Sequence, residues 1–165
     1  MTKSKEEIAI KMVLVAWHSK VKQFDKLLSE LSDEQLLKEV SPGRNRGIYI
    51  LGHLTGLADH AALLLGFTKE LAAPHLVKPF IQTPDKEIND LPAPTELRTE
   101  WEKAKNVLAD HVAASAPGEW FQKHTSVSEE DFEKEPHRNK LNVMLSRASH
   151  LDYHLGQLIF LKNRK

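Results

Sequence analysis

Residues 48–66 read IYILGHLTGLADHAALLLG, and this stretch decides the fold of the chain. It is too long and too apolar for a strand, so it predicts a buried helix that Gly66 ends. A helix that is apolar on almost every side needs other helices around it, because its surface cannot face water. Its inward stripe is expected to contain Ile50, His53, Leu57, His60 and Leu64.

Three further segments show the spacing of amphipathic helices and supply the expected neighbours. They cover residues 4–31, 95–115 and 139–161. Short accessory helices are expected after Ser32 and after Ser128, and prolines mark long connections between the main helices. Since no segment alternates with the period of a strand, the sequence predicts an all-α four-helix bundle, formed as a single domain by residues 1–165.

The composition narrows the class of protein. The chain has 165 residues, and its 23 lysines and arginines balance 23 aspartates and glutamates. This neutrality gives no electrostatic reason to expect nucleic acid or a membrane surface as a partner. The lack of cysteine excludes disulfides, thiolate metal sites and a cysteine nucleophile. No apolar stretch reaches the roughly 18 residues of a membrane span, and MTKSKEEIAI lacks a signal-peptide core, so we expect a cytoplasmic protein.

Nine histidines are the main reactive groups of the chain, and two of them suggest a shared metal. His150 and His154, in SHLDYHLGQLIFL, are four residues apart, which places their Cβ atoms about 5 to 6 Å apart on one helix face. That face borders the apolar arc of the helix and therefore points towards the interior edge of the bundle. One HxxxH pair is a weak signal by itself, because such pairs also arise on helix surfaces.

His53 in the buried helix strengthens the metal hypothesis. An unpaired imidazole is costly to bury, so His53 needs either a hydrogen-bonding neighbour or a metal. Three neutral imidazoles that meet between two helices leave coordination positions open, as catalytic metal sites do. His60 lies seven residues further along, or about 10.5 Å, too far to join the same cluster easily. It is either a pocket-lining acid or base or a structural partner of the first helix.

Several catalytic signatures are missing from the sequence, among them the Glu-x-x-His of di-iron bundles, HExxH, GxSxG and a Gly-rich phosphate loop. The segments YILGHLTGLADHAALLLG and HLDYHLGQLIFLKN instead resemble the DinB/YfiT-like superfamily of metal-dependent enzymes, and the resemblance covers nearly the whole chain. His53 matches the histidine of the family's second helix. His150 and His154 match its HxxxHxGQ segment, which Gly156 and Gln157 complete.

The resemblance implies a four-helix bundle with up-down-down-up connectivity and a divalent metal, either nickel, zinc or iron, on His53, His150 and His154. Characterised relatives include S-transferases that use bacillithiol or mycothiol and a mycothiol-dependent maleylpyruvate isomerase. The implied partner is therefore a small-molecule substrate, with a low-molecular-weight thiol as one candidate. Family members are often homodimers. No catalytic residue beyond the metal ligands can be matched.

Three functions stay open at this point. A thiol in an open coordination position would be held as thiolate for attack on an electrophile, which describes a metal-dependent transferase. Water in the same position would make a metal-dependent hydrolase. A non-catalytic stress-response module would bind the metal or a ligand without turnover.

We expect the long connections at residues 67–94 and 118–138 to frame a pocket that leads to the metal. The residues expected in this pocket are Trp17, Leu57, His60, Gln157 and Leu161, although Gln157 is equally suited to helix packing. Because protons compete with a metal for imidazole lone pairs, we also expect metal affinity to fall between about pH 7 and pH 5.

Overall fold

The computed structural model describes residues 4–162 as an all-helical chain. Its four long helices are α1 (Lys5–Glu30), α3 (Gly47–Leu64), α4 (Pro94–Ala114) and α6 (Lys140–Leu158). The shorter elements are α2 (Asp33–Leu36), η1 (Pro74–Leu76), η2 (Lys78–Gln82), η3 (Pro117–Phe121), α5 (Glu129–Lys134) and η4 (Ile159–Leu161). Across the described residues, β-structure is limited to isolated bridges, so the prediction of an all-α chain is confirmed.

The helix ends follow the signals in the sequence. The Ser32 hydroxyl accepts a hydrogen bond from the Gln35 backbone N–H at 3.2 Å, and Gln35 Oε1 accepts from the Ser32 N–H at 2.8 Å. This reciprocal pair is a capping box and begins α2 as predicted. Gly66 follows α3 with a φ of +74°, a left-handed conformation that glycine adopts easily and that ends the helix. The final turn, η4, differs from the prediction because it is a 3-10 helix rather than a continuation of α6.

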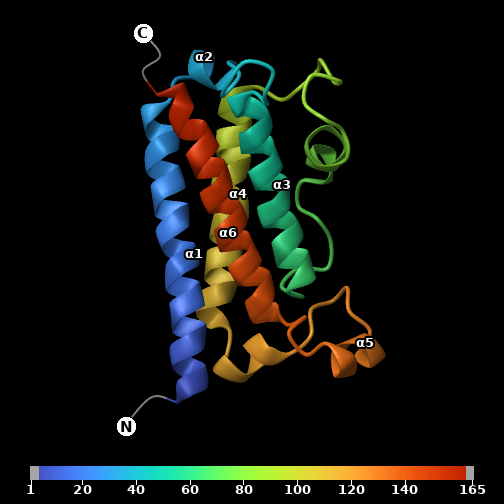
Figure 1. Ribbon diagram of the computed structural model, residues 1–165. Helices are drawn as coiled ribbons and strands as arrows, with labels where there is room; N and C mark the ends of the chain where they lie inside the picture. Colours follow the sequence, from blue (N-terminus) through green and yellow to red (C-terminus); the bar gives the residue numbers. More distant parts are fainter. Residues whose placement is uncertain (1–3, 163–165) are drawn as a thin grey trace.

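Figure 1 shows the four long helices side by side. The segment 65–93 returns along the outside of α3, so that α3 and α4 both begin at the end of the molecule where α2 lies, and α1 and α6 both end there. Arg98 near the start of α4 fastens this end, since its guanidinium donates to the carbonyl oxygens of Leu28 and Leu31 at 2.7 Å each. The inner faces of the four helices contribute to one hydrophobic core.

Small residues on α3 let the returning segment lie directly against that helix. A Cβ atom at Gly52 would lie 2.5 Å from the ring of Phe80, and one at Gly56 would lie 3.3 Å from Ile81. The buried carboxylate of Asp59 accepts hydrogen bonds from two backbone N–H groups of the same segment, those of residues 72 and 73, at 3.1 and 2.9 Å. These contacts fix the Phe80 backbone beside α3, where it meets His53.

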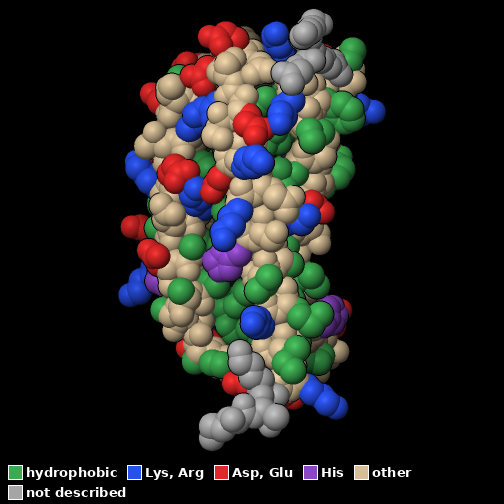
Figure 2. Space-filling model, turned by 90° about the vertical axis from the view of Figure 1, so that its left-hand side faces the viewer, with side chains coloured by type: hydrophobic (Ala, Val, Ile, Leu, Met, Phe, Trp, Pro, Cys, Tyr) green, Lys and Arg blue, Asp and Glu red, His purple; other side chains and the backbone are tan. Residues whose placement is uncertain are grey.

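The side of the molecule formed by α1 combines mixed charge with an apolar area. Figure 2 shows acidic and basic side chains interspersed on this face, with hydrophobic side chains gathered in the half nearer the N-terminus. The large exposed apolar residues of α1 are Ile8, Met12 and Val15. Apolar areas of this kind are common at contact surfaces, and the homodimer stays a prediction. None of the helices within residues 4–162 combines the length and hydropathy that a bilayer crossing requires.

Candidate metal centre

His53 on α3 and two histidines on α6 bring three imidazole nitrogens together. His150 Nε2 lies 3.3 Å from His53 Nε2 and 2.8 Å from His154 Nε2. One ring nitrogen from each residue lies within 4.8 Å of the other two. With metal–nitrogen bonds of about 2.0 to 2.1 Å, two ligand nitrogens lie about 3.4 Å apart at a tetrahedral angle and about 2.9 Å apart at a right angle. The two measured separations are close to these values, so the three residues can hold one divalent ion.

The orientation of His53 is set by a segment far away in the sequence. Its Nδ1–H donates to the Phe80 carbonyl oxygen at 2.8 Å, and because a carbonyl can only accept, the lone pair is left on Nε2. Tyr49 stacks against the imidazole, with ring centroids 6.2 Å apart and an interplanar angle of 10°. The Tyr49 hydroxyl donates to the Thr83 carbonyl at 2.9 Å, which ties the ring stack to the same returning segment.

The orientation of His154 is set within its own helix. Its Nδ1 lies 2.7 Å from Gln157 Oε1, an acceptor, so Nδ1 carries the proton and the lone pair again lies on Nε2. His154 is buried, and Tyr153 presents an edge-on ring to it with centroids 5.0 Å apart. Such outer partners of metal-binding histidines fix the tautomer and raise the basicity of the ligand nitrogen. Gln157 therefore supports the candidate site by holding His154.

The three converging nitrogens carry too few protons to be satisfied by hydrogen bonds to one another. Both His53 and His154 direct an Nε2 lone pair towards the Nε2 of His150. A neutral His150 has at most one proton on that nitrogen and can donate it to one neighbour, which leaves further lone pairs facing one another. A cation between the three nitrogens would satisfy all of them at once. The residues present therefore fit a divalent metal, and no carboxylate belongs to this group within the described part of the chain.

The pKa values of all three imidazoles are lowered, mainly by burial. For His154, burial lowers the pKa to about 4, despite the opposing hydrogen bond to Gln157. Burial is also the largest cause for His53 and His150, whose pKa values fall further through the positive charge of Arg147. The three residues are therefore neutral at pH 7, which is the form that binds metal. The expected loss of metal between about pH 7 and pH 5 stays a prediction, and the lowered pKa of each imidazole shifts proton competition with a metal to lower pH.

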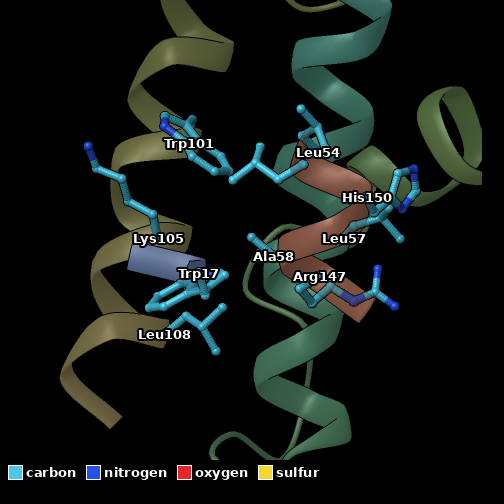
Figure 3. Close-up of a pocket in the computed structure, with 10 residues that line it drawn as sticks. Trp17, Leu54, Leu57, Ala58, Trp101, Lys105, Leu108, Arg147 and His150 are labelled. Atoms are coloured by element: carbon cyan, nitrogen blue, oxygen red, sulfur yellow. The ribbon is translucent and has the colours of Figure 1, made fainter. Parts of the chain in front are cut away.

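A narrow cavity opens beside His150 between the long helices. Its apolar wall comes from α1, α3, α4 and α6, and its polar groups are Lys105, Arg147 and His150. Figure 3 shows the polar ends of Arg147 and His150 on the side of the cavity away from Trp17 and Trp101. The cavity volume is about 30 Å³, so it admits only a small group of atoms.

Two of the five expected pocket residues line this cavity. Trp17 and Leu57 line the cavity, whereas His60, Gln157 and Leu161 do not. His60 is too far along α3 from His53, and Gln157 is engaged with His154. Leu161 packs at the far end of the molecule, against Gly47, and its carbonyl accepts from the Gln35 side chain at 2.9 Å.

The expectation that residues 67–94 and 118–138 frame this cavity was wrong. Helix side chains alone line it, because the returning segment packs closely against α3 and meets the candidate site from outside, through the Phe80 carbonyl.

Two contributors to the site were missed by sequence reasoning. The Phe80 carbonyl leaves no signal in the sequence, because every residue has a backbone carbonyl oxygen. Arg147 did leave one: it precedes His150 by three residues and His154 by seven, a spacing that places all three on one helix face.

The comparisons with known proteins add no relative. No protein-family model and no curated protein matches the sequence. The likeness to DinB/YfiT-like proteins therefore stays a prediction that depends on the residues around His53, His150 and His154.

Proposed function

We propose that the chain is a DinB-like metal-dependent enzyme that binds one divalent ion through His53, His150 and His154. The observation that carries this proposal is the convergence of one nitrogen from each residue within 4.8 Å. On His53 and His154 the other ring nitrogen is already hydrogen-bonded, which leaves the converging nitrogen free to bind metal.

The donor set restricts the ion and the coordination. Neutral imidazole suits zinc, nickel and iron, and three such ligands do not strongly select among them. Three protein ligands leave at least one position for a substrate or water, which is typical of catalytic sites and not of closed structural ones. The cavity beside His150 supplies an approach to that position from between the helices.

The directions of the helices in Figure 1 support the DinB-like assignment. The first and last long helices run one way and the two central ones run the other, as the up-down-down-up connectivity requires. The return of residues 65–93 along the outside of α3 supplies the long crossover that this connectivity needs. The same crossover carries Phe80, which anchors one of the proposed ligands.

The reaction we propose is the transfer of a group to a low-molecular-weight thiol. A bound divalent ion would lower the pKa of the thiol and so supply a thiolate near pH 7. The sulfur forms a bond to an electrophilic carbon of the second substrate, the leaving group departs with its bonding electron pair, and the thiol proton passes to solvent. Trp17 and Leu57 keep the approach apolar, which strengthens electrostatic effects there.

Metal analysis followed by a thiol-consumption assay tests this function. We expect about one divalent ion per chain in the wild type, its loss in the His150→Ala variant, and its retention in the His137→Ala variant, which removes an exposed histidine. The loaded wild type should then consume thiol in the presence of at least one member of a panel of electrophiles.

Other outcomes of the same assay point to the alternative functions. Cleavage of ester or amide substrates without thiol would identify a hydrolase. Bound metal without turnover on either panel would identify a binding module. No metal binding by the wild type would overturn the proposal.

A further inference from the structure

Arg147 is a charged residue at the candidate site that the proposed ligand set does not use. It lies on α6 three residues before His150 and lines the same cavity. Figure 3 shows its guanidinium on the same side of the cavity as the His150 ring. Its positive charge acts on both His53 and His150. Whatever binds at the cavity therefore meets this charge.

Arg147 has no partner for its charge among residues 4–162. Its Nε and Nη1 atoms are buried without a hydrogen-bond acceptor. The described ion pairs do not include it, and burial alone lowers its pKa. An arginine side chain is still protonated under ordinary conditions, so a half-buried positive charge lies at the cavity without an ion-pair partner in the described chain.

A purely structural role does not explain such a residue. A buried donor without an acceptor destabilises the folded state, and the destabilisation is larger when the group is charged. An apolar side chain of similar length would fill the same space without that cost. The contrast with Lys105 is informative, because that ammonium lines the same cavity but pairs with Asp25 and Glu102 at 2.7 Å each. Arg147 is the charged group there that lacks a counterion within the described chain.

The chemistry of the missing partner follows from the charge and the space. A guanidinium presents N–H groups in a planar fork that matches the two oxygens of a carboxylate. A carboxylate supplies one negative charge and two coplanar oxygens to this fork. The small cavity volume also favours the compact carboxylate.

We propose that Arg147 binds the carboxylate of a small ligand whose other end reaches the three-histidine site. This inference rests on the proposed function, because it describes the substrate class of that same site. The proposal predicts that either the thiol or the electrophile carries a carboxylate a few bonds from its reacting atom.

Two thiols that differ only at one end test the role of Arg147. The probes are 3-mercaptopropionate and 3-mercapto-1-propanol, titrated into zinc-loaded protein at constant ionic strength. The fluorescence of Trp17 and Trp101 reports binding, because both rings line the cavity. We expect the wild type to bind the acid at least about 10-fold more tightly than the alcohol, in line with charge-assisted pairing.

Three variants connect that preference to Arg147. Arg147→Met keeps the apolar stem and should bring the acid-to-alcohol preference to about one, while Arg147→Lys keeps the charge and should retain part of it. Arg44→Met removes an exposed arginine and should leave the preference unchanged. The midpoint of thermal unfolding of the Arg147→Met variant, measured without ligand, should be no lower than that of the wild type, which shows that the variant is folded. No acid preference in the wild type, or an undiminished one in Arg147→Met, would overturn the proposal.

A second titration separates this inference from the proposed function. Propionate and 1-propanol are added to protein stripped of metal, with zinc binding measured independently for each variant. If the wild type prefers propionate and Arg147→Met does not, the role of Arg147 is supported even where zinc fails to bind. If zinc binds but neither the wild type nor any variant prefers propionate, the proposed role of Arg147 is overturned and the proposed metal site is supported.

Discussion

His53 and His154 use the same chemistry but are held by different parts of the molecule. Each places a proton on Nδ1 and directs Nε2 towards His150. The acceptor for His154 is Gln157, three residues away on the same helix, whereas the acceptor for His53 is the Phe80 carbonyl, 27 residues away. One ligand is therefore prepared by a local helical contact and the other by tertiary packing.

The two anchors should fail in different ways. Removing the Gln157 side chain leaves the helix intact, because the amide makes no contact that α6 needs to form. Displacing Phe80 disturbs a fully buried ring and the packing of η2 on α3. A change to the local anchor is thus expected to alter metal affinity alone, whereas a change to the distant anchor is expected to alter both stability and metal affinity.

The largest expected effect comes from the residue that both anchored histidines face. His150→Ala should lower zinc affinity by more than about 100-fold, beyond the 10- to 100-fold typical of an outer partner, because it removes a ligand atom. The fold should persist, since His150 is only half-buried and the core residues are unchanged. Competition with a chromogenic chelator measures the affinity, and circular dichroism checks the fold. Loss of helical structure in this variant would indicate a structural histidine cluster instead.

The local anchor is tested by Gln157→Ala. Without the acceptor on Nδ1, His154 loses its fixed tautomer, and zinc affinity should fall by about 10- to 100-fold. The free energy of unfolding of the metal-free protein, from urea titration, should change much less than in a core variant. Gln122→Ala, at an exposed glutamine, is the matched control and should change neither quantity. An unchanged affinity in Gln157→Ala would show that the helix alone orients His154.

The distant anchor is tested by Gly52→Ala. Its Cβ atom would lie 2.5 Å from the Phe80 ring, so η2 must move and the unfolding free energy should fall by about 1 to 3 kcal/mol. Zinc affinity should fall as well, by up to about 10-fold, because the Phe80 carbonyl moves with the ring. Gly156→Ala is the control on the other helix, where nothing lies within 4 Å of the new Cβ atom and helix propensity should add about 0.5 to 1 kcal/mol. A destabilised Gly52→Ala protein with unchanged zinc affinity would show that the packing of Phe80 stabilises the fold but does not control metal binding by His53.

The smallest expected effect concerns pH and the metal-free protein. The pKa of His154 is about 4 when folded and 6.5 in the reference state, so between these values the unfolded chain binds a proton that the folded chain does not. Above pH 6.5 this residue does not reduce the free energy of unfolding, and as the pH falls towards 4 it reduces that free energy progressively. Between pH 6 and pH 5 the loss should be about 1 kcal/mol. Urea titrations of the wild type and His154→Gln should differ by this amount, and equal pH dependence in the two proteins would contradict the lowered pKa.

The sequence alone predicted the helical class and named the three histidines of the candidate site. Helix spacing identified the four long helices, and capping residues such as Ser32 marked the short ones, because both signals are local. The pairing of His150 with His154 was also predictable, since residues four apart on a helix always share a face. Even the contact from Gln157 to His154 lies within one turn of the same helix.

Tertiary structure decided the rest, because the remaining contacts join segments that are distant in the chain. The meeting of His53 with His150 depends on how α3 packs against α6. The Phe80 carbonyl reaches His53 only because Gly52 lets η2 lie against α3, and a backbone oxygen has no signature in a sequence. Likewise, the spacing placed Arg147 on the histidine face, but only the packed helices show that its charge has no partner there. Local spacing determines which side chains share a helix face, whereas burial and long-range contacts determine which of them can act together.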